Sequence, residues 1–553
     1  MSNDTARTRL ATHAVVNQPV PTGDRDFLAL DIPLQEALKR EAPDWVARRL
    51  APLGVNTGSL YHQQLGETAN RHPPELRLFD RHGRRLDEVS YHPAYHELMH
   101  LAFDHGWHAV AWQEESCGGH QAHVAALYLL TQVEPGFCCP FTMTHAAMPA
   151  LRHQPDVLSQ WAPKLLAWDY DGRAIPASEK PAVTMGMAMT EKQGGSDVRA
   201  ATTRAVPDVA TQANSGYRLI GHKWFCSAPM SDAFLTLAQT DDGLGCFLVP
   251  RFMPNGERNA LEIQRLKDKC GNRANASAEI EYRHAWCQPV GDPGRGIATI
   301  LDMVQQTRLD AATAPAGMMR QALLEAWHHV QGRQAFGQRL ADQPMMRMVI
   351  ADLTLEVEAS LALVMRTARA FDSPGDDHEA ALARLLPALA KYWHNKRGSG
   401  FMVEAMECLG GNGYVEESPL ARLYREAPVN AIWEGSSNVI CLDVLRVLAR
   451  HPASVRALQT ELEVSSNQHP DYDLAVDDIM GILASPPETI ELGARWLTQR
   501  LAQTLQASLL LQYAPAAIAD AFCQSRLGKK AGAAYGNLST DAPLDAILAR
   551  ITP

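Results

Sequence analysis

Long apolar runs are missing from this chain of 553 residues. No stretch approaches the ~18 consecutive apolar residues that a membrane helix needs. The opening residues, MSNDTARTRLATHAVV, also lack the apolar segment of a secretory signal peptide. We therefore expect no membrane span and no export, and the cytoplasm is the expected location.

Cysteine is sparse, and basic residues are outnumbered by acidic ones. The 10 cysteines include no C-x-x-C spacing, which favours buried thiols in a reducing compartment over a disulfide framework. Lys and Arg total 51 against 62 Asp and Glu, giving a formal net charge of −11. This balance excludes a protein that is basic overall, as many nucleic-acid binders are, but leaves room for a local basic patch.

Two phosphate-binding signatures are also missing. The chain has no G-x-x-x-x-G-K-[ST] and no G-x-G-x-x-G that opens a helix, so neither nucleotide hydrolysis nor a Rossmann domain is indicated. Instead, a Gly-rich loop follows an expected strand in MAMTEKQGGSD, residues 187–197. Its free amides and hydroxyls suit a planar heterocycle or a phosphate, and the simpler interpretation is a Gly-rich hairpin.

The periodicity of apolar residues divides the chain into four expected domains. Residues 1–183 read mostly as helix after a polar arm, and 184–290 read as short strands. Residues 291–450 carry long helices at 297–334, 345–371 and 379–409, and 451–553 carry a helical stripe of Leu497, Leu501, Leu505 and Leu509. We predict an α+β protein of several domains, mainly α, with an inserted β domain.

One motif favours a rival interpretation. The run from His96 to His100 fits H-E-x-x-H, which on a helix places two imidazoles on one face with a Glu as base. A zinc hydrolase also needs a third ligand, and no extended metzincin spacing follows. We favour packing or capping within a helical bundle and predict no metal.

The most informative stretch is 409–446, LGGNGYVEESPLARLYREAPVNAIWEGSSNVICLDVLR. Gly410, Gly411 and Gly413 let backbone approach a ligand closely because they lack a Cβ. Glu434 stands beside Trp433 ahead of an amphipathic helix, which suits a general base in an apolar pocket. An ordinary N-terminal helix residue is the simpler alternative.

This stretch resembles the C-terminal signature of the acyl-CoA dehydrogenase superfamily, in which a Gly-Gly-x-Gly turn precedes a catalytic Glu-Gly-Ser or Glu-Gly-Thr. The loop TEKQGGSD, the strand GHKWFCS and the run RQAFG resemble three further motifs of that superfamily. The added C-terminal helical domain and the segment REAPVNAIWEGSS make the chain most similar to the AidB-type branch, the alkylation-response flavoproteins.

The resemblance implies a three-domain dehydrogenase fold, an N-terminal helical domain, a middle β domain and a four-helix bundle, followed by an extra helical domain. It implies FAD as cofactor and Glu434 as the base that removes the α-proton of an acyl thioester, with base, substrate and flavin stacked. The flavin contacts that it implies are Met187, Met189, Thr190, Gly195, Ser196, Phe225, Cys226, Ser227, Arg333, Gly410, Gly411, Ile432, Trp433, Gly435, Ser436 and Asn438.

The sequence departs from the superfamily pattern at three positions. Phe225 stands where the family has Trp, so an indole N–H is lost. Glu407 stands where the family has Gln, which puts one contact to the adenosine half of FAD in doubt. Thr307 precedes Arg308 where some relatives place their base, so Glu434 is the remaining candidate.

Two functions then stand side by side. The first is a DNA-associated flavoprotein of the response to alkylation, a homotetramer that binds double-stranded DNA through its C-terminal domain and has weak or vestigial dehydrogenase activity. The second is a working acyl-CoA dehydrogenase of fatty-acid or branched-chain catabolism. Residues 451–553 contain 7 Lys and Arg against 11 Asp and Glu, so DNA contacts must form a patch. The candidates are Arg446, Arg495, Arg500, Arg526, Lys529 and Lys530.

Overall fold

The computed structural model describes residues 6–114, 117–208, 216–529 and 532–553. Contacts divide the chain into two compact units. The helical unit comprises residues 1–63, 116–133 and 311–553, and the barrel unit comprises residues 64–115 and 134–310. Each unit is described by itself.

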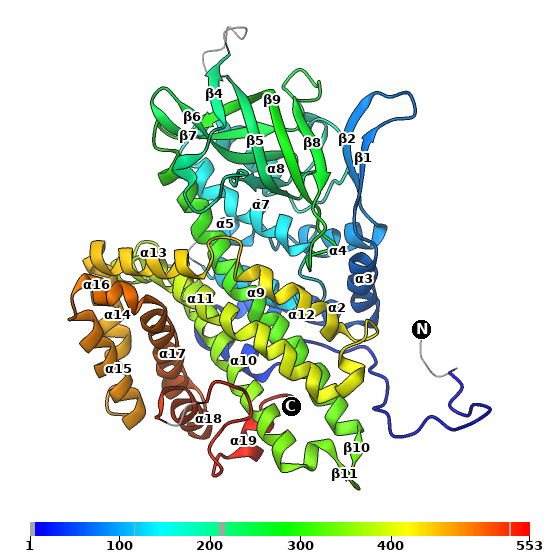
Figure 1. Cartoon of the computed structure of the whole chain (residues 1–553), viewed down its shortest axis with the longest axis vertical. Coiled ribbons are helices and arrows are strands. Elements are labelled where there is room, and N and C mark those ends of the chain that lie inside the picture. Colours follow the sequence, from blue (N-terminus) through cyan, green and yellow to red (C-terminus); the bar gives the residue numbers. More distant parts are fainter. Residues whose placement is uncertain (1–5, 115–116, 209–215, 530–531) are drawn as a thin grey trace. The chain divides into compact units, whose positions relative to one another are not determined.

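A closed β-barrel forms the core of the barrel unit (Figure 1). Its strands are β3 (Met185–Ala188), β4 (Arg204–Pro207), β5 (Tyr217–Ser227), β6 (Ala233–Thr240), β7 (Gly243–Pro250), β8 (Leu261–Leu266) and β9 (Ser277–Val290). The pairing runs β6-β4-β5-β9-β7 and returns to β6, while β3 pairs with β6 and β8 with β9. Closure leaves few free strand edges, and apolar side chains from all seven strands, including Ala188 of β3 and Ala205 of β4, fill the interior.

Helices and one hairpin complete the barrel unit. Its helices include α4 (Pro93–Phe103), α5 (Val110–Gln113), α7 (Cys138–Leu151) and α8 (Pro155–Leu165). Residues 64–71 of α3 (Leu60–Arg71) and residues 296–310 of the long helix α9 (Gly296–Gly332) also belong to this unit. The antiparallel hairpin of β1 (Glu75–Phe79) and β2 (Arg85–Ser90) lies in the segment that we expected to be mostly helix. Its strands are only partly buried, so their hydrophobic periodicity is too weak to distinguish them from a loop.

Long antiparallel helices form the helical unit. They include α1 (Ile32–Glu41), α2 (Asp44–Gly58), α6 (Gly119–Leu130), α9 (Gly296–Gly332), α10 (Pro344–Phe371), α11 (Asp377–Leu409), α12 (Pro419–Asn430) and α13 (Ser437–Arg450). The bounds of α9, α10 and α11 lie within two residues of the predicted ranges. Asp31 caps α1 and also accepts from Tyr128 of α6 and pairs with Arg320 of α9.

The chain after residue 450 is helical, as predicted: α14 (Pro452–Glu463), α15 (Pro470–Leu483), α16 (Pro487–Leu492), α17 (Ala494–Tyr513), α18 (Ala516–Phe522) and α19 (Leu544–Leu548). The predicted leucine stripe of α17 is buried and packs on α10 and α11. These helices therefore belong to the same compact unit as the bundle. The limits that we assign to four domains stay a prediction.

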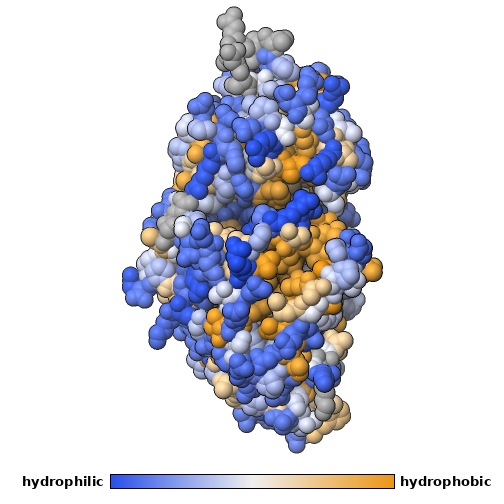
Figure 2. All heavy atoms as spheres, turned by 90° about the vertical axis from the view of Figure 1, so that its left-hand side faces the viewer, coloured by the Kyte–Doolittle hydropathy of each residue, from blue (hydrophilic) through white to orange (hydrophobic). Residues whose placement is uncertain are grey.

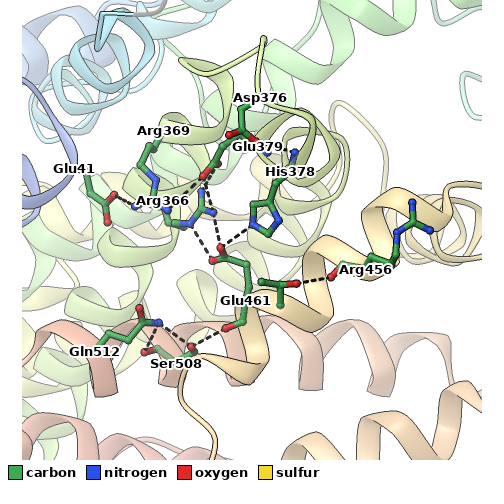
Figure 3. Close-up of polar contacts among 11 residues, drawn as sticks. Glu41, Arg366, Arg369, Asp376, His378, Glu379, Arg456, Glu461, Ser508 and Gln512 are labelled. Atoms are coloured by element: carbon green, nitrogen blue, oxygen red, sulfur yellow. Dashed lines mark hydrogen bonds and ion pairs between the residues drawn. The ribbon is translucent and has the colours of Figure 1, made fainter.

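A buried ion cluster joins α14 to the bundle (Figure 3). Arg366 of α10 donates to Glu379 of α11 at 2.7 Å and to Glu461 of α14 at 2.7 Å. Only 2% of the Arg366 side chain is exposed, so both carboxylates are needed to offset its desolvation. One turn further along α10, Arg369 pairs with Glu41 at 2.8 Å.

The fold class is confirmed: the chain is mainly helical, with a middle β domain and a helical C-terminal region. Among the described residues, no helix is both long enough and apolar enough to cross a bilayer.

Candidate active site

The end of β5 presents two predicted flavin contacts on one face. Phe225 is 47% exposed and Ser227 is half-buried, whereas Cys226 between them is fully buried in the barrel core. This alternation is the ordinary period of a strand. A bulge against β9 between Lys223 and Cys226 bends the strand at this point. Any contact from Cys226 to a ligand on this face must therefore come from its backbone.

The Gly-rich loop after β3 lies against the same strand. The backbone N–H of Trp224 donates to the carbonyl of Thr190 at 2.7 Å. A Cβ on Gly195 would come within 2.3 Å of Thr190 Oγ1, so the loop packs this closely only because residue 195 is glycine. Ser196 is exposed, and Met187, Met189 and Thr190 are half-buried. The structure thus brings the predicted contacts of the barrel unit together at the ends of β3 and β5.

A buried ion pair that the sequence analysis missed fixes this loop to β5. Lys223 Nζ lies 2.9 Å from Glu191 Oε1, and both side chains are at most 1% exposed. Glu191 also accepts from the backbone N–H groups of Thr202 and Thr203. Burial alone raises the pKa of Glu191, but these hydrogen bonds and the Lys223 charge outweigh it and hold that pKa well below its usual value. The sequence does show both residues, Glu191 in the loop TEKQGGSD and Lys223 in the strand GHKWFCS, but no local pattern indicates that they pair.

In the helical unit, Glu434 occupies a strained turn between α12 and α13. Its φ is +57°, a left-handed conformation that non-glycine residues rarely adopt, and Gly435 follows with φ +103°. Ile432 is 65% exposed, and Trp433 and Glu434 are half-buried. Ser436 is the N-cap residue of α13, and both it and Asn438 are exposed. Such strain persists where the surroundings hold it, and it is common at active sites.

Lys391 of α11 holds this turn through two hydrogen bonds. Its side chain is buried, and Nζ donates to the carbonyl of Gly435 at 2.9 Å and to that of Asn430 at 3.1 Å. These two carbonyls flank the segment that carries Glu434. The lysine therefore fixes both ends of the turn, a role that the sequence analysis did not assign because the contact spans about forty residues.

The glycine turn at the end of α11 is open to a ligand. Gly410 has φ +60°, and a Cβ on Gly410 or Gly411 would meet no atom within 4 Å. By contrast, a Cβ on Gly413 would lie 2.4 Å from the Met406 carbonyl oxygen. Gly413 is thus required by packing, while the backbone of Gly410 and Gly411 can be approached from outside.

Arg333 lies where a hairpin begins. The run RQAFG is by itself typical of a helix C-terminus with Gly337 as its cap, but α9 ends at Gly332 and is followed by the hairpin of β10 (Gln334–Ala335) and β11 (Gln338–Arg339). Phe336 and Gly337 both have positive φ, as a two-residue hairpin turn requires. Arg333 Nη1 donates to the carbonyl of Asn17 at 3.0 Å.

The H-E-x-x-H residues lie on α4 as expected, and both histidines have other partners. His96 Nδ1 lies 2.9 Å from the Tyr170 hydroxyl, and His100 pairs with Asp104 at 3.0 Å. Within the described ranges, neither histidine belongs to a group of three side chains that could hold a metal ion.

The candidate DNA contacts are not equally available. Arg446 and Arg495 are exposed, although Arg446 pairs with Asp443 and Arg495 donates to the Tyr392 hydroxyl. The Arg500 side chain is 14% exposed and pairs with Asp478. Lys529 is exposed, and Lys530 lies outside the described residues.

Arg526 does not belong to a surface patch. Its residue is 8% exposed, and its guanidinium pairs with Asp352 and, at 3.1 Å, with Glu356 of α10. If Arg526 turned toward a phosphate, the buried Asp352 would lose this cation and Glu356 would keep only Arg397. Its role is to attach the C-terminal helices to the bundle.

The residues present fit a flavin cofactor. The barrel unit offers an exposed aromatic ring, hydroxyls and a glycine loop on one face, which suits the ring system of FAD. In the helical unit, the buried Trp433 Nε1 has no hydrogen-bond partner within the described part of the chain, and open glycine backbone lies at Gly410 and Gly411. A bound heterocycle would satisfy such groups.

Comparison with known families covers most of the chain. Residues 17–172 match the adaptive response protein AidB N-terminal domain. Residues 186–285 match the acyl-CoA dehydrogenase middle domain, and residues 294–449 match the acyl-CoA dehydrogenase C-terminal domain.

Individual relatives agree with these matches. AidB of Escherichia coli (strain K12) is 45% identical over 523 residues, which cover 94% of this chain and 95% of the relative. Acyl-CoA dehydrogenase family member 11 of Caenorhabditis elegans is 31% identical over 77% of this chain and 70% of the relative.

Solved structures are similar over nearly the whole length. The crystal structure of Caenorhabditis elegans ACDH-11 in complex with C11-CoA has a TM-score of 0.83 at 26% identity and covers 94% of this chain and 92% of its own. The apo form of Bd2924 has a TM-score of 0.83 at 28% identity, with 90% and 99% covered.

Fold and site together define a flavoprotein of the acyl-CoA dehydrogenase type, with FAD as its cofactor. The chain belongs to the acyl-CoA dehydrogenase superfamily and, within it, to the AidB-type group.

Proposed function

We propose that this protein oxidises an acyl-CoA thioester, with Glu434 as the base. The observation that carries the proposal is the left-handed Glu434 turn, whose flanking carbonyls are held by the buried Lys391. Removal of the α-proton needs a carboxylate whose position is fixed, because the base must be aligned with the C–H bond that it breaks. The C11-CoA bound to the similar C. elegans protein supports an acyl-CoA as the substrate class.

Different residues of the chain contact different parts of FAD in this proposal. FAD supplies the electron acceptor. Thr190, Ser196 and Ser227 offer hydroxyls to it, Phe225 offers a ring face, and Arg333 offers a guanidinium to a phosphate. The other contacts that we propose are Met187, Met189, Gly195, the Cys226 backbone, Gly410, Gly411, Ile432, Trp433, Gly435, Ser436 and Asn438.

Bleaching of the flavin absorbance by acyl-CoA thioesters of graded chain length, without oxygen, tests this function. In Glu434→Gln the bleaching rate should fall by about 10²- to 10⁴-fold, the usual contribution of a positioned base, while bound FAD stays unchanged. Glu417→Gln, at an exposed position of the same segment, is the matched control. Equal rates in wild type and Glu434→Gln would reject Glu434 as the base.

A second candidate function is binding of double-stranded DNA in the adaptive response to alkylation, with weak or vestigial dehydrogenase activity. Membership of the AidB-type group favours it. Of the candidate DNA contacts that the structure describes, Arg446, Arg495 and Lys529 are exposed. Exposed apolar side chains lie on the same helices, Leu442 of α13 at 43% and Trp496 of α17 at 44% exposure, and Leu492 at the end of α16 is 92% exposed. Figure 2, viewed from the side of α14 to α16, likewise shows hydrophobic patches among hydrophilic side chains.

Charge substitution tests DNA binding better than truncation, because α14 and Arg526 carry buried ion pairs of the bundle. We would titrate a labelled random duplex at several salt concentrations, following fluorescence anisotropy. Changing Arg446, Arg495 and Lys529 to Gln should each reduce the salt slope by about one. Arg84→Gln, at an exposed position of the β1–β2 turn, is the control. An unchanged slope in the triple variant, or no binding at low salt, would reject this surface.

We also propose a homotetramer built as a dimer of dimers. Leu442, Leu492 and Trp496 are exposed apolar side chains that further copies of the chain would bury. Sedimentation velocity gives the mass directly, and a monomer at micromolar concentration would reject the proposal.

A further inference from the structure

A cavity of about 240 Å³ lies within the barrel unit, apart from the residues assigned to FAD or to DNA. Its walls come from β2, α4, the loop 170–174 and the segment 228–231. The side chains that define it are Tyr91, Tyr95, His96, Tyr170, Met230 and Ser231. Nothing in the proposed dehydrogenase chemistry uses it.

Aromatic rings form one wall of the cavity. Tyr91 and Tyr95 are stacked, with ring centroids 4.3 Å apart and planes 19° apart. The His96 ring contacts both of these rings edge-on. Its centroid lies 5.8 Å from that of the Tyr170 ring, and its Nδ1 is hydrogen-bonded to the Tyr170 hydroxyl. Rings held this firmly offer flat faces and edges of fixed orientation to a bound ring.

The ionisable groups of this wall are neutral. Burial raises the pKa of Tyr91, Tyr95 and Tyr170 well above the ordinary value for a phenol. Burial, and then the nearby His100, lower the pKa of His96. Four uncharged donor or acceptor groups therefore line an aromatic surface at neutral pH.

The two carboxylates that line the cavity are already paired, and Arg77, the other charged residue of the lining, is exposed. Glu88 pairs with Arg258, and Asp171 pairs with Arg173 at 2.6 Å. Because arginines already neutralise both carboxylates, neither can neutralise a cationic guest. The cavity therefore differs from the aromatic sites that bind ammonium ions. A neutral guest needs no such partner.

Ser231 contributes a buried wall hydroxyl that has no hydrogen-bond partner among the described residues. Only 3% of this residue is exposed. A buried hydroxyl without a partner costs free energy, and a polar guest would satisfy it. Across the cavity, a Cβ on Gly172 would lie 2.9 Å from the Tyr170 hydroxyl and 3.0 Å from His96 Nδ1, so only glycine lets this loop leave the pair undisturbed.

We propose that this cavity is a binding site for an uncharged, planar aromatic molecule with a hydrogen-bonding edge, of the size of a one- or two-ring heterocycle. The guest stacks on the Tyr91–Tyr95 wall and bonds to Ser231 Oγ. The site is independent of the proposed dehydrogenase reaction and of DNA binding.

Line broadening in ¹⁹F NMR tests the proposal with 5-fluoroindole as the probe and the FAD-loaded full chain as the receptor. The probe is neutral and flat and has one N–H donor. We expect saturable broadening. Tyr95→Leu should raise the Kd about tenfold by removing a ring face, and Ser231→Ala about fivefold by removing the partner of the N–H. Tyr513→Leu makes the same change at another cavity, in the helical unit, and should leave the Kd unchanged.

Three outcomes would overturn the proposal. One is an absence of broadening at a probe concentration of about 1 mM, which corresponds to negligible affinity. Another is broadening that persists unchanged in both Tyr95→Leu and Ser231→Ala. The third is equal binding of 4,4-difluorocyclohexanol, which has a hydroxyl but no flat ring. Bound FAD, read from absorbance in the same samples, and the melting temperature distinguish loss of this site from loss of folding.

Discussion

At the scale of single residues, the contacts that matter most are buried charges inside familiar motifs. Lys223 and Glu191 lie within the strand and loop motifs that the sequence displays, yet neither was singled out beforehand. Glu434 was a candidate from its motif alone, but its left-handed backbone could not be foreseen, because φ depends on the contacts that hold the turn.

The Lys223–Glu191 pair gives a prediction at this scale. Lys223→Met leaves Glu191 buried without its cation, a change that typically costs about 3–5 kcal/mol. We expect a lower melting temperature and less bound FAD, because the Gly-rich loop loses its attachment to β5. Differential scanning calorimetry and flavin absorbance measure both. Lys192→Met, at an exposed position of the same loop, should behave like wild type; if the two variants are equally stable, the pair is dispensable.

At the scale of elements, α14 is held to the bundle by charge. Burial alone raises the pKa of Glu461, but the Arg366 guanidinium and His378 outweigh it, so the net shift is downward. A carboxyl with a lower pKa in the folded state contributes stability above its unfolded pKa of about 4.5 and loses it as the pH falls further.

We therefore predict a pH-dependent effect of Glu461→Gln. The melting temperature of this variant should lie below that of wild type at pH 7, and the difference should shrink below about pH 4.5 as Glu461 of wild type takes up a proton. Thermal scans across pH 3.5 to 7, by circular dichroism, measure the difference. Glu463→Gln on the exposed side of α14 should show little difference at any pH. A constant gap between Glu461→Gln and wild type would contradict the assignment.

At the scale of the whole molecule, the C-terminal helices are part of the helical unit. Arg526 pairs with Asp352 and Glu356 of α10, and Arg550 pairs with Glu358 at 2.6 Å. Leu497 and Leu501 of α17 are fully buried. The tail that looks like an addition in the sequence thus completes the core of the bundle.

A chain that ends at Arg450 should consequently fail to fold normally. It removes the Arg526 partner of Asp352 and Glu356, the Arg550 partner of Glu358 and the Glu461 partner of Arg366. It also exposes apolar surface of α10 and α11. We expect aggregation during purification and loss of the cooperative thermal transition. Deletion of the first 12 residues, whose described members are exposed, should leave folding intact. A soluble truncated chain with the wild-type melting temperature would show that the tail is separable.

The sequence alone determined the succession of helical, β and helical segments, because hydrophobic period and turn residues are local properties. It also determined the family motifs around Thr190, Phe225, Arg333 and Glu434. Tertiary structure decided the rest: that Cys226 faces the barrel core, that Phe336 and Gly337 make a hairpin, that Arg526 is buried, and that Lys391 holds the Glu434 turn. These depend on contacts between residues far apart in the chain, and no local pattern specifies which distant carboxylate or carbonyl a charged side chain will meet.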